Sequence, residues 1–559
     1  MKKVKNYFKN KQWAVWQINL MVSFGFVLLF NQLFWQEIGT LLELNSLADV
    51  WFLVSIFLLV VTVINLVLNV LVSKTSRLYV YGFLLFITCI CFYYMMQYNI
   101  VIDRDMIRNV METNASEAKD LLSFNLLFYF LLLFVLPVWL IAKLQVKQLS
   151  FMGLCLEKTI VMLVSLPVMG GLIYFSYPSY ASLARENHQL SHMILPTNFI
   201  FASLSYVNEQ ISNHSEVFEE ITSDTVMKQD LSAGKKVTII IVGETARADR
   251  FGLNQYSRNT NPKLSQRKLI NFQHTTSCGT STATSLPCLF SYLERNKYNH
   301  RLGKNSSNLL DFYKSVGFDV QWRDNNTGCK GLCDRVEFVD MTHLEDNPLC
   351  QTGECFDEVL LSGLKEQIIS NNNNQLIVLH QKGSHGPAYH LRYPKDFEVF
   401  KPTCKEVQLQ KCSREALNNS YDNTILYTDY VIDATIALLE SLPEDTESSL
   451  VYVSDHGESL GENNLYLHGT PYLIAPESQK HVPFLFWASN QYQQHTHINQ
   501  ACLERKQSLG VSHDNFFHSM LGLVNINSSY YQANLDVFAS CQPSDVSVLV
   551  ASEHPINGS

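Results

Sequence analysis

Acidic and imidazole side chains follow three apolar, β-branched runs of the chain, within a few residues of the end of each run. The runs are 237–242, 376–379 and 450–453, and the side chains that follow them are Glu244, His380, Asp455 and His456. Such runs are typical of buried parallel strands, and α/β sheets bind ligands beyond the carboxyl ends of their strands. Two carboxylates and an imidazole are a ligand set suited to zinc. We therefore expect Glu244, Asp455 and His456 to bind one divalent metal ion.

A segment rich in hydroxyl side chains lies between Cys278 and Cys288 and reads CGTSTATSLPC. An unperturbed hydroxyl is a poor nucleophile, and coordination to a metal ion is one way to activate it. If the segment begins a helix, the first backbone N–H groups face an anionic substrate such as a phosphate. The segment therefore predicts phosphoryl transfer with a covalent step. Spacing leaves four candidate nucleophiles open: Thr280, Ser281, Thr282 and Thr284.

Strands and helices alternate in the part of the chain that holds these residues. Helical patterns separate the apolar runs, and they include 308–316, 354–369 and 419–441. This alternation predicts an α/β domain with a mainly parallel central sheet. Four asparagines at 371–374 predict a surface turn between two such elements.

The cysteines divide the chain of 559 residues into two parts. Three lie in or beside the apolar N-terminal part, and ten lie beyond it, mostly in couples that are close in sequence. An even number in this arrangement predicts disulfides and an oxidising compartment. The spacing does not resemble a zinc ribbon, so we prefer disulfides to metal-bound or buried free thiols. The ten are Cys278, Cys288, Cys329, Cys333, Cys350, Cys355, Cys404, Cys412, Cys502 and Cys541.

Five stretches of the N-terminal part are long and apolar enough to cross a bilayer, which takes about 20 helical residues. They cover roughly 15–34, 51–72, 78–94, 122–142 and 159–175. Pro137 and Pro167 lie inside spans, where neighbouring helices can satisfy the freed backbone groups. The net charge of −9 is thus an average over a membrane part and an ordinary soluble part.

Lysines and arginines set the orientation of the spans. They gather in the N-terminal tail, after the second span and after the fourth span, so these segments are cytoplasmic and the chain after residue 177 is exported. We expect a transmembrane domain at 1–177, a connector at 178–232 and a catalytic domain at 233–559. The connector has amphipathic helical stretches such as 196–211, which either lie along the membrane surface or pack on the catalytic domain.

Five ordered motifs resemble those of the lipid A phosphoethanolamine transferases, a family that includes the mobile colistin-resistance enzymes. The motifs are VGETARADR at 242–250, SCGTSTATSLPC at 277–288, RDNNTGCKGLC at 323–333, GSHGP at 383–387 and SDHGESLGE at 454–462. The resemblance covers nearly the whole chain. It implies five transmembrane helices in the inner membrane of a Gram-negative bacterium and a periplasmic domain of the alkaline phosphatase and sulfatase type.

The resemblance also implies an activity. Glu244, Asp455 and His456 match the family's zinc ligands, and Thr282 matches its nucleophile, which is also the fourth ligand. The implied reaction carries phosphoethanolamine from phosphatidylethanolamine to a lipid A phosphate through a phosphothreonine intermediate. One zinc ion is expected to be firmly bound, with a second as an option. The added amine would lower the negative charge of lipid A and give resistance to polymyxins and other cationic peptides.

Further residues match positions to which the family assigns substrate contacts. His385 and His468 match histidines that bind a second zinc or the substrate phosphate, and Asn326 and Lys330 match residues that hold the phosphoethanolamine group. We expect a monomer with phosphatidylethanolamine, lipid A and membrane lipids as partners and no nucleic-acid partner.

The loop between the third and fourth expected spans has its own match. Asn109, Thr113 and Glu117 match a periplasmic loop that contacts the lipid substrate, and their spacing would place them on one helix face. Glu112 and Asp120, in the same loop, are interpreted as solvated charges. Arg247, in the first motif, is given no role beyond structure.

The family's disulfides imply the pairing of the cysteines. The implied pairs are Cys278–Cys288, Cys329–Cys333, Cys350–Cys355 and Cys404–Cys412, with Cys502–Cys541 as the remaining pair.

Alternative functions use the same fold. The acceptor could be Kdo or a core heptose in place of lipid A. A phosphoglycerol transferase of the lipoteichoic-acid synthase type shares the spans and the threonine but generally lacks this density of cysteines. A sulfatase needs C/S-x-P-x-R, which is absent at 278–290. A non-catalytic sensor or scaffold is disfavoured because all four expected metal ligands are present.

Overall fold

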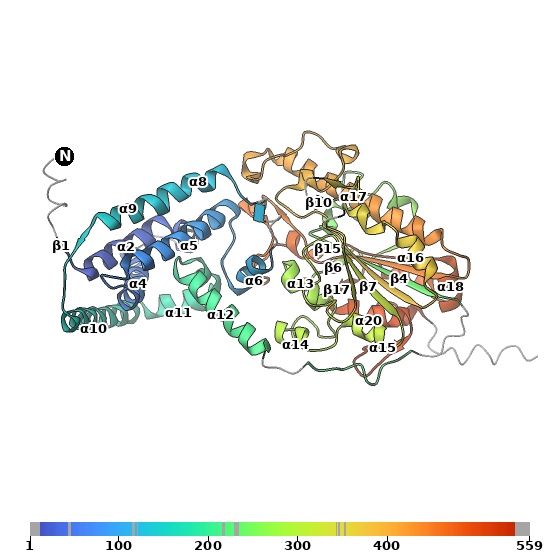
Figure 1. The fold of residues 1–559 in the computed structure, drawn as a ribbon, viewed down its shortest axis with the longest axis horizontal. Helices are drawn as coiled ribbons and strands as arrows, with labels where there is room; N and C mark the ends of the chain where they lie inside the picture. Colours follow the sequence, from blue (N-terminus) through green and yellow to red (C-terminus); the bar gives the residue numbers. More distant parts are fainter. Residues whose placement is uncertain are drawn as a thin grey trace, which may run out of the picture. The chain divides into compact units, whose positions relative to one another are not determined.

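The computed structural model describes residues 12–42, 46–113, 118–119, 121–214, 218–227, 234–342, 344, 347–351 and 354–542 (Figure 1). The chain divides into two compact units. One comprises Met1–Ile107 with Leu122–Val207, and the other comprises Arg108–Leu121 with Asn208–Ser559. This division differs from the expected boundaries in two places: residues 108–121 group with the C-terminal unit, and the expected connector, 178–232, is divided between the units after Val207.

The N-terminal unit is helical. Its helices are α2 (Val15–Leu29), α3 (Gln32–Leu41), α4 (Leu47–Leu71), α5 (Arg77–Tyr98), α8 (Phe124–Phe130), the π-helix η1 (Leu131–Val135), α9 (Leu136–Lys143), α10 (Phe151–Phe175), α11 (Tyr177–Glu186), the 3-10 helix η2 (His188–Met193) and α12 (Thr197–His214). Two short strands, β1 (Gln12–Trp13) and β2 (Gln145–Val146), pair in parallel. The helix α12 confirms the helical pattern expected at 196–211.

Four of these stretches are long and apolar enough to cross a membrane: α4, α5, α8 through α9, and α10. The first expected span, roughly 15–34, is not one helix, because α2 and α3 are bent by 61° at a break between them. Asn31 holds this break: its Nδ2 donates to the carbonyls of Phe26 and Leu195, each at 2.9 Å. Its Oδ1 accepts the backbone N–H of Leu195 at 2.8 Å. If this bent pair counts as one span, the described residues hold five candidate spans in place of four.

Both prolines lie inside spans, as expected. Pro167 is inside α10. Pro137 stands at the start of α9, directly after the π-helical turn η1. A π-helical turn is one of the local adjustments by which a span tolerates the missing N–H of a proline.

A seven-stranded sheet forms the centre of the C-terminal unit, in the order β5-β16-β12-β4-β11-β7-β8. The strands are β5 (Ile270–Asn271), β16 (Phe484–Ala488), β12 (Glu447–Ser454), β4 (Lys236–Gly243), β11 (Gln375–His380), β7 (Asp319–Asp324) and β8 (Glu337–Asp340). From β12 to β8 all neighbours are parallel, and β16 runs antiparallel to both of its neighbours. The expected mainly parallel sheet is confirmed, and the three predicted strands are its adjacent members β12, β4 and β11.

Helices cover both faces of this sheet (Figure 1). They are α13 (Thr282–Leu289), α14 (His300–Lys304), α15 (Leu309–Ser315), α16 (Leu364–Ser370), α17 (Arg414–Glu440), α18 (Asn490–Thr496), α19 (Gln500–Lys506) and α20 (Asp514–Leu523). Alternate residues of β4 point to opposite faces, so Ile240 and Val242 enter the core with α15 and α20, whereas Ile239 and Ile241 enter the core with α16 and α17.

The expected helix at 354–369 is only partly correct. Its first residues form β10 (Glu354–Cys355), which pairs with β9 (Cys350–Gln351), and a 3-10 turn, Asp357–Leu361, follows. Gly363 then adopts a left-handed conformation (φ 69°) before α16 begins. A left-handed residue ends a continuous helix, and glycine adopts it without steric cost. The helices expected at 308–316 and 419–441 are present as α15 and α17.

Smaller elements complete the C-terminal unit. The remaining strands are β3 (Val226–Met227), β6 (His274–Thr276), β13 (Ser459–Leu460), β14 (Tyr466–Leu467), β15 (His481–Val482), β17 (Gly510–Ser512) and β18 (Ile526–Asn527), and α6 covers Arg104–Glu112. Further 3-10 turns are Ala248–Arg250, Gly252–Asn254, Leu264–Gln266, Tyr389–Leu391, Lys395–Phe397, Leu409–Lys411, Glu462–Asn464, Glu477–Gln479 and Ala539–Cys541. All five implied cysteine pairs are bonded in the structure.

Candidate active site

The site lies at the carboxyl edge of the sheet, where β4 and β12 end side by side. Gly243 and Ser454 are register partners at the ends of these strands, and Glu244 and Asp455 follow directly. His456 is the next residue after Asp455. Parallel pairing therefore brings together residues that are more than 200 positions apart in the sequence.

The three expected ligands form a compact group. One ligand atom from each of Glu244, Asp455 and His456 lies within 4.8 Å of the others, and all three residues are buried. Nε2 of His456 is 3.5 Å from Oε1 of Glu244 and 3.4 Å from Oδ2 of Asp455. Among the described residues, these two carboxylate oxygens accept no hydrogen bond.

The charge states of this group call for a cation. Burial lowers the pKa of His456 to about 4, so the ring is neutral at pH 7. Its Nδ1 donates to the carbonyl of Gly457 at 2.9 Å, which leaves a lone pair on Nε2 facing the two carboxylates. Burial raises the pKa of Asp455 to about 6, and burial together with Asp455 raises that of Glu244. Electron-rich atoms this close are destabilising unless a positive charge lies between them.

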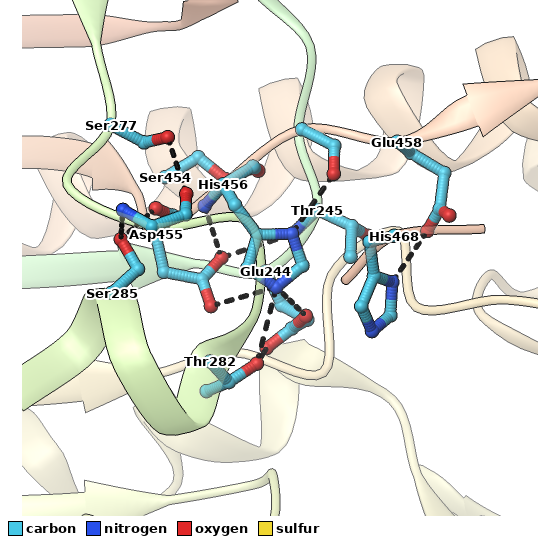
Figure 2. Close-up of polar contacts among 12 residues, drawn as sticks. Glu244, Thr245, Ser277, Thr282, Ser285, Ser454, Asp455, His456, Glu458 and His468 are labelled. Carbon is cyan, nitrogen blue, oxygen red and sulfur yellow. Dashed lines mark hydrogen bonds and ion pairs between the residues drawn. The ribbon is translucent and has the colours of Figure 1, made fainter. Parts of the chain in front are cut away.

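The hydroxyl of Thr282 lies against this group (Figure 2). It donates to Oε2 of Glu244 at 3.0 Å and lies 3.3 Å from Nε2 of His456. Thr282 is the first residue of α13, and Ser281 is the N-cap. The first N–H groups of a helix have no partner within the helix, so they can face an anion. The disulfide Cys278–Cys288 joins the segment before this helix to its last turn.

The other hydroxyls of the segment have different surroundings. Thr280 donates to the carbonyl of Thr470 at 2.6 Å, and Ser285 donates to the carbonyl of Asp455 at 2.5 Å. The hydroxyl of Thr284 is buried and makes no hydrogen bond among the described residues. Among the described hydroxyls of this segment, that of Thr282 contacts the expected ligands Glu244 and His456, and the geometry favours it as the nucleophile.

Two further histidines adjoin the metal-binding group. The ring of His468 is 4.5 Å from that of His456 and 5.5 Å from that of His385, measured between centroids. Burial works against protonation of His468, but the carboxylate of Glu458, 3.3 Å away, raises its pKa to about 9. Burial and Lys382 lower the pKa of His385 well below its usual value. One histidine is thus protonated at pH 7 and its neighbour is neutral.

Asn326 contacts a metal-ligand candidate directly. Its Nδ2 donates to Oε2 of Glu244 and to the carbonyl of Gln381, both at 2.9 Å, and it is buried. Behind it, Nδ1 of His380 lies 2.8 Å from Oδ2 of Asp324. Burial acts to raise the pKa of Asp324, but the charge of His380 outweighs it and lowers that pKa to about 2. Asn326 thus orients Glu244, a contact that the sequence did not indicate.

Lys330 lines a pocket of about 410 Å³ in the same unit. Its ammonium donates to the hydroxyl of Thr327 at 2.9 Å and lies 4.0 Å from Oε2 of Glu112. Lys304 lies 3.6 Å from the other oxygen of Glu112. The interpretation of Glu112 as a solvated charge was wrong, because the residue is paired with two lysines and is only 20% exposed.

The loop residues expected to meet the lipid lie at the end of α6. Asn109 is the helix's sixth residue and is partly buried, and the Thr113 hydroxyl donates back to the Asn109 carbonyl at 2.7 Å. Arg108, fully buried, donates to Oε2 of Glu209 at 2.6 Å, and this pair joins α6 to the C-terminal part of α12, where both residues belong to the C-terminal unit. Glu117 and Asp120 lie outside the described residues.

Sequence reasoning missed one residue that the site uses. Glu458 follows His456 by two positions in the motif SDHGESLGE, yet only the structure pairs it with His468. The signal was present as the second acid of that motif, but its partner lies on the far side of the hairpin formed by β13 and β14. Arg247 bonds Asp249, Glu462 and the carbonyl of Glu458, and so has the structural role that was expected.

Comparison with known proteins decides the family. Residues 236–526 match the family model described as Sulfatase, and residues 35–211 match that of Phosphoethanolamine transferase EptA/EptB. The phosphoethanolamine transferase EptA of Salmonella typhimurium is 41% identical over 94% of this chain and 96% of its own. The chain belongs to the phosphoethanolamine transferases.

Other members of this family agree. The phosphatidylethanolamine transferase Mcr-2 of Escherichia coli is 34% identical over 86% of this chain and 91% of its own. The solved integral membrane lipooligosaccharide phosphoethanolamine transferase A from Neisseria meningitidis matches 95% of this chain and 100% of its own. That match has a TM-score of 0.91 and 34% identity. This transferase is therefore a multi-pass enzyme of the Gram-negative inner membrane with a sulfatase-type catalytic unit in the periplasm.

Proposed function

We propose that this transferase carries phosphoethanolamine from phosphatidylethanolamine to a lipid A phosphate, with Thr282 as the nucleophile. One observation supports this most strongly: the Thr282 hydroxyl lies 3.0 Å from Glu244 and 3.3 Å from His456, inside a group of electron-rich atoms that calls for a cation. The relatives are named as phosphoethanolamine and phosphatidylethanolamine transferases, which supports the choice of group and donor.

The group suits zinc. Two carboxylate oxygens and an imidazole nitrogen, with a threonine oxygen as the fourth ligand, match the coordination that zinc prefers. Zinc bound there would lower the pKa of the threonine hydroxyl and neutralise charge on the phosphoryl oxygens. Removal of zinc by a chelator should abolish transfer, and added zinc should restore it.

In the first step, Oγ1 of Thr282 attacks the donor phosphorus, and the bond from phosphorus to the diacylglycerol oxygen breaks. Diacylglycerol leaves with a proton, and phosphoethanolamine stays on the threonine. In the second step a lipid A phosphate oxygen attacks the same phosphorus, and Oγ1 of Thr282 leaves and recovers a proton. Each step is an in-line displacement that depends on positioning and charge stabilisation.

The surrounding residues stabilise the transferred group. Protonated His468 donates one ring N–H to Glu458 and offers the other to a phosphoryl oxygen, whereas neutral His385 supplies a lone pair for a second zinc or a proton. Asn326 keeps Glu244 in place. Lys330 binds the phosphoethanolamine phosphate after its contact with Glu112 opens, and Asn109, Thr113 and Glu117 meet the donor lipid. We take the active form to be a monomer.

Mass spectrometry of lipid A tests the proposal. Cells that express the chain should gain one phosphoethanolamine on lipid A, and they should become less susceptible to polymyxin because the added amine offsets a phosphate charge. Thr282→Ala should abolish the gain, a loss of at least about a thousandfold. Thr284→Ala is the matched control, because this hydroxyl stands in the same helix and makes no described hydrogen bond.

The outcomes separate donor, acceptor and nucleophile. Modification of Kdo or a core heptose with unmodified lipid A would overturn the acceptor and leave the chemistry intact. Transfer of phosphoglycerol would overturn the donor. A phosphoethanolamine adduct on a residue other than Thr282, found by peptide mapping of the trapped enzyme, would overturn the nucleophile.

A further inference from the structure

An exposed apolar turn stands out in the catalytic unit. In the apolar turn, residues 471–475, Leu473 is 94% exposed and its neighbour Ile474 is 46% exposed. No other large hydrophobic side chain of the described residues 234–542 is as exposed as Leu473. A single exposed leucine is ordinary on a protein surface. Two adjacent exposed apolar side chains at the tip of a turn are a feature of surfaces that contact lipid or protein.

The backbone of the apolar turn is fixed. The N–H of Ile474 donates to the carbonyl of Pro471 at 3.0 Å, and the N–H of Ala475 donates to that of Tyr472 at 3.4 Å. Pro471 and Pro476 restrict φ on both sides of the turn. The apolar tip is therefore held outward by a stiff turn.

The turn is also tied to the segment that carries the nucleophile. The Tyr472 hydroxyl donates to the Ser277 carbonyl at 2.9 Å, and the Thr280 hydroxyl donates to the Thr470 carbonyl at 2.6 Å. The N–H of Gly469 donates to the carbonyl of Thr280 at 2.7 Å, two residues before Thr282. These hydrogen bonds hold the tip of the apolar turn at a fixed distance from Thr282, so whatever surface binds the tip also positions the nucleophile.

Cationic side chains surround the base of the turn. The Arg295 guanidinium lies 3.3 Å from the centre of the Tyr472 ring, and the Lys480 ammonium lies 5.5 Å from it. Two acids are near. Glu477 pairs with Lys480 at 2.9 Å, and Asp514 accepts the backbone N–H of Arg295 at 2.7 Å. An apolar tip above a tyrosine and basic side chains is the arrangement by which proteins lie at a membrane surface.

We propose that the apolar turn inserts into the periplasmic surface of the phospholipid bilayer and holds Thr282 at the depth of the lipid headgroups. Leu473 and Ile474 enter the acyl boundary, Tyr472 lies among the headgroups, and Arg295 and Lys480 face lipid phosphates. The chain itself keeps this unit near a bilayer through its four or five spans. The kinetic part of the inference rests on the proposed function, in which the donor is a membrane lipid that the enzyme reaches at the bilayer surface.

Depth measurement tests insertion without any activity. The full chain carries Leu473→Cys with a nitroxide label, with Cys89, Cys91 and Cys155 replaced by serine because these are its free cysteines. It is reconstituted in vesicles of phosphatidylethanolamine and phosphatidylglycerol, and collision of the label with oxygen and with a water-soluble nickel chelate is compared. Ile369→Cys is the control: Ile369 matches Ile474 in type and exposure (46%) but lies in the last turn of α16, near the amino edge of the sheet.

The proposal expects the label at 473 to collide more with oxygen and less with nickel than the label at 369. Equal collision ratios at the two positions would overturn it. A label at 473 that is shielded from both reagents would also overturn it, because it would indicate contact with a protein surface.

Kinetics test the consequence for the reaction. Leu473→Ser with Ile474→Ser should raise KM for donor in vesicles about tenfold, the effect of losing partial burial of two apolar side chains. It should leave kcat, and the turnover of a short-chain, monomerically dissolved phosphatidylethanolamine, unchanged, and Ile369→Ser should change neither. An unchanged KM for the vesicle donor, or an equal loss with both donors, would overturn the proposal. If the unsubstituted enzyme transfers nothing from either donor, the proposed function fails, and the depth measurement still decides insertion.

Discussion

The two ends of the strands β4 and β12 carry buried charges of opposite character. At the amino end, Lys236 and Glu447 are register partners, and their side chains form an ion pair of 2.6 Å. At the carboxyl end, Glu244 and Asp455 follow register partners of the same strands. All four residues are buried. The same two strands thus hold a pair of opposite charges at one end and a pair of like charges at the other.

The difference separates a structural pair from a functional one. The second oxygen of Glu447 lies 2.6 Å from Nδ1 of His495, so that carboxylate is satisfied on both sides. One oxygen of Glu244 and one of Asp455 accept no hydrogen bond among the described residues. Buried charge without a partner is costly, so the carboxyl end favours the binding of a ligand of opposite charge.

Removal of one charge at the carboxyl end should have the largest effect on activity. Glu244→Gln keeps the shape and deletes a proposed zinc ligand, so transfer should fall at least about a thousandfold, equivalent to about 4 kcal/mol. The metal-free protein should lose no stability, because burial and Asp455 already raise the pKa of Glu244. Zinc content and transfer in vesicles measure the first effect, and thermal unfolding of the metal-free protein measures the second.

The matched change at the amino end should lower stability and leave activity nearly unchanged. Glu447→Gln leaves Lys236 buried without its counter-charge, which should lower the free energy of unfolding by about 3 kcal/mol. Transfer per folded molecule should stay within about twofold of the unsubstituted enzyme. Unfolding midpoints and active-site titration measure the two quantities. If Glu447→Gln abolished transfer without loss of stability, the contrast between the two ends would not hold.

Two buried histidines sharpen the contrast. Glu458 keeps His468 protonated at the site, whereas burial lowers the pKa of His518, in α20, to about 4. Because the unfolded chain protonates this histidine near pH 6.5, the stability from neutral His518 is present above that pH and lost as the pH falls towards 4. The loss should be about 3 kcal/mol at most.

His518→Gln should flatten this acid limb. Glutamine offers an oxygen to the N–H of Gln532, which donates to Nδ1 of His518 at 3.2 Å, and it does not titrate. Unfolding free energies between pH 7 and pH 4 measure the slope. An unchanged slope in the variant would show that other groups cause the acid instability.

The smallest effect is expected at Glu112, which lines the pocket of Lys330 and, like the charges at the amino end, is paired with opposite charge. Glu112→Gln should free Lys304 and Lys330 for the anionic donor and lower KM by about two- to fivefold, the size of a partly exposed ion pair. Asp334→Asn is the control, because Asp334 lines the same pocket and is exposed. A rise in KM for the Glu112 variant would show that this carboxylate supports donor binding.

Particular residues show how far the sequence alone reached. The three strands around the site were predicted because their β-branched runs are continuous, whereas β7 was missed because Asp319–Asp324 mixes charged and apolar residues. The first span was expected as one helix because apolarity alone does not reveal that Asn31 bonds Leu195. The roles of Glu458 and Glu112 were missed because each depends on a partner that local sequence does not identify.

The sequence by itself determined the spans, the exported cystine-rich half, the parallel strands and the ligand types, because these follow from local apolarity, periodicity and side-chain chemistry. Only the tertiary structure decided which hydroxyl contacts the expected ligands, which histidine is protonated and which segment the apolar turn is hydrogen-bonded to. The physical reason is distance. Thr282 lies 174 positions from His456 in the chain yet 3.3 Å from it in space, and strand order and helix packing alone set that separation.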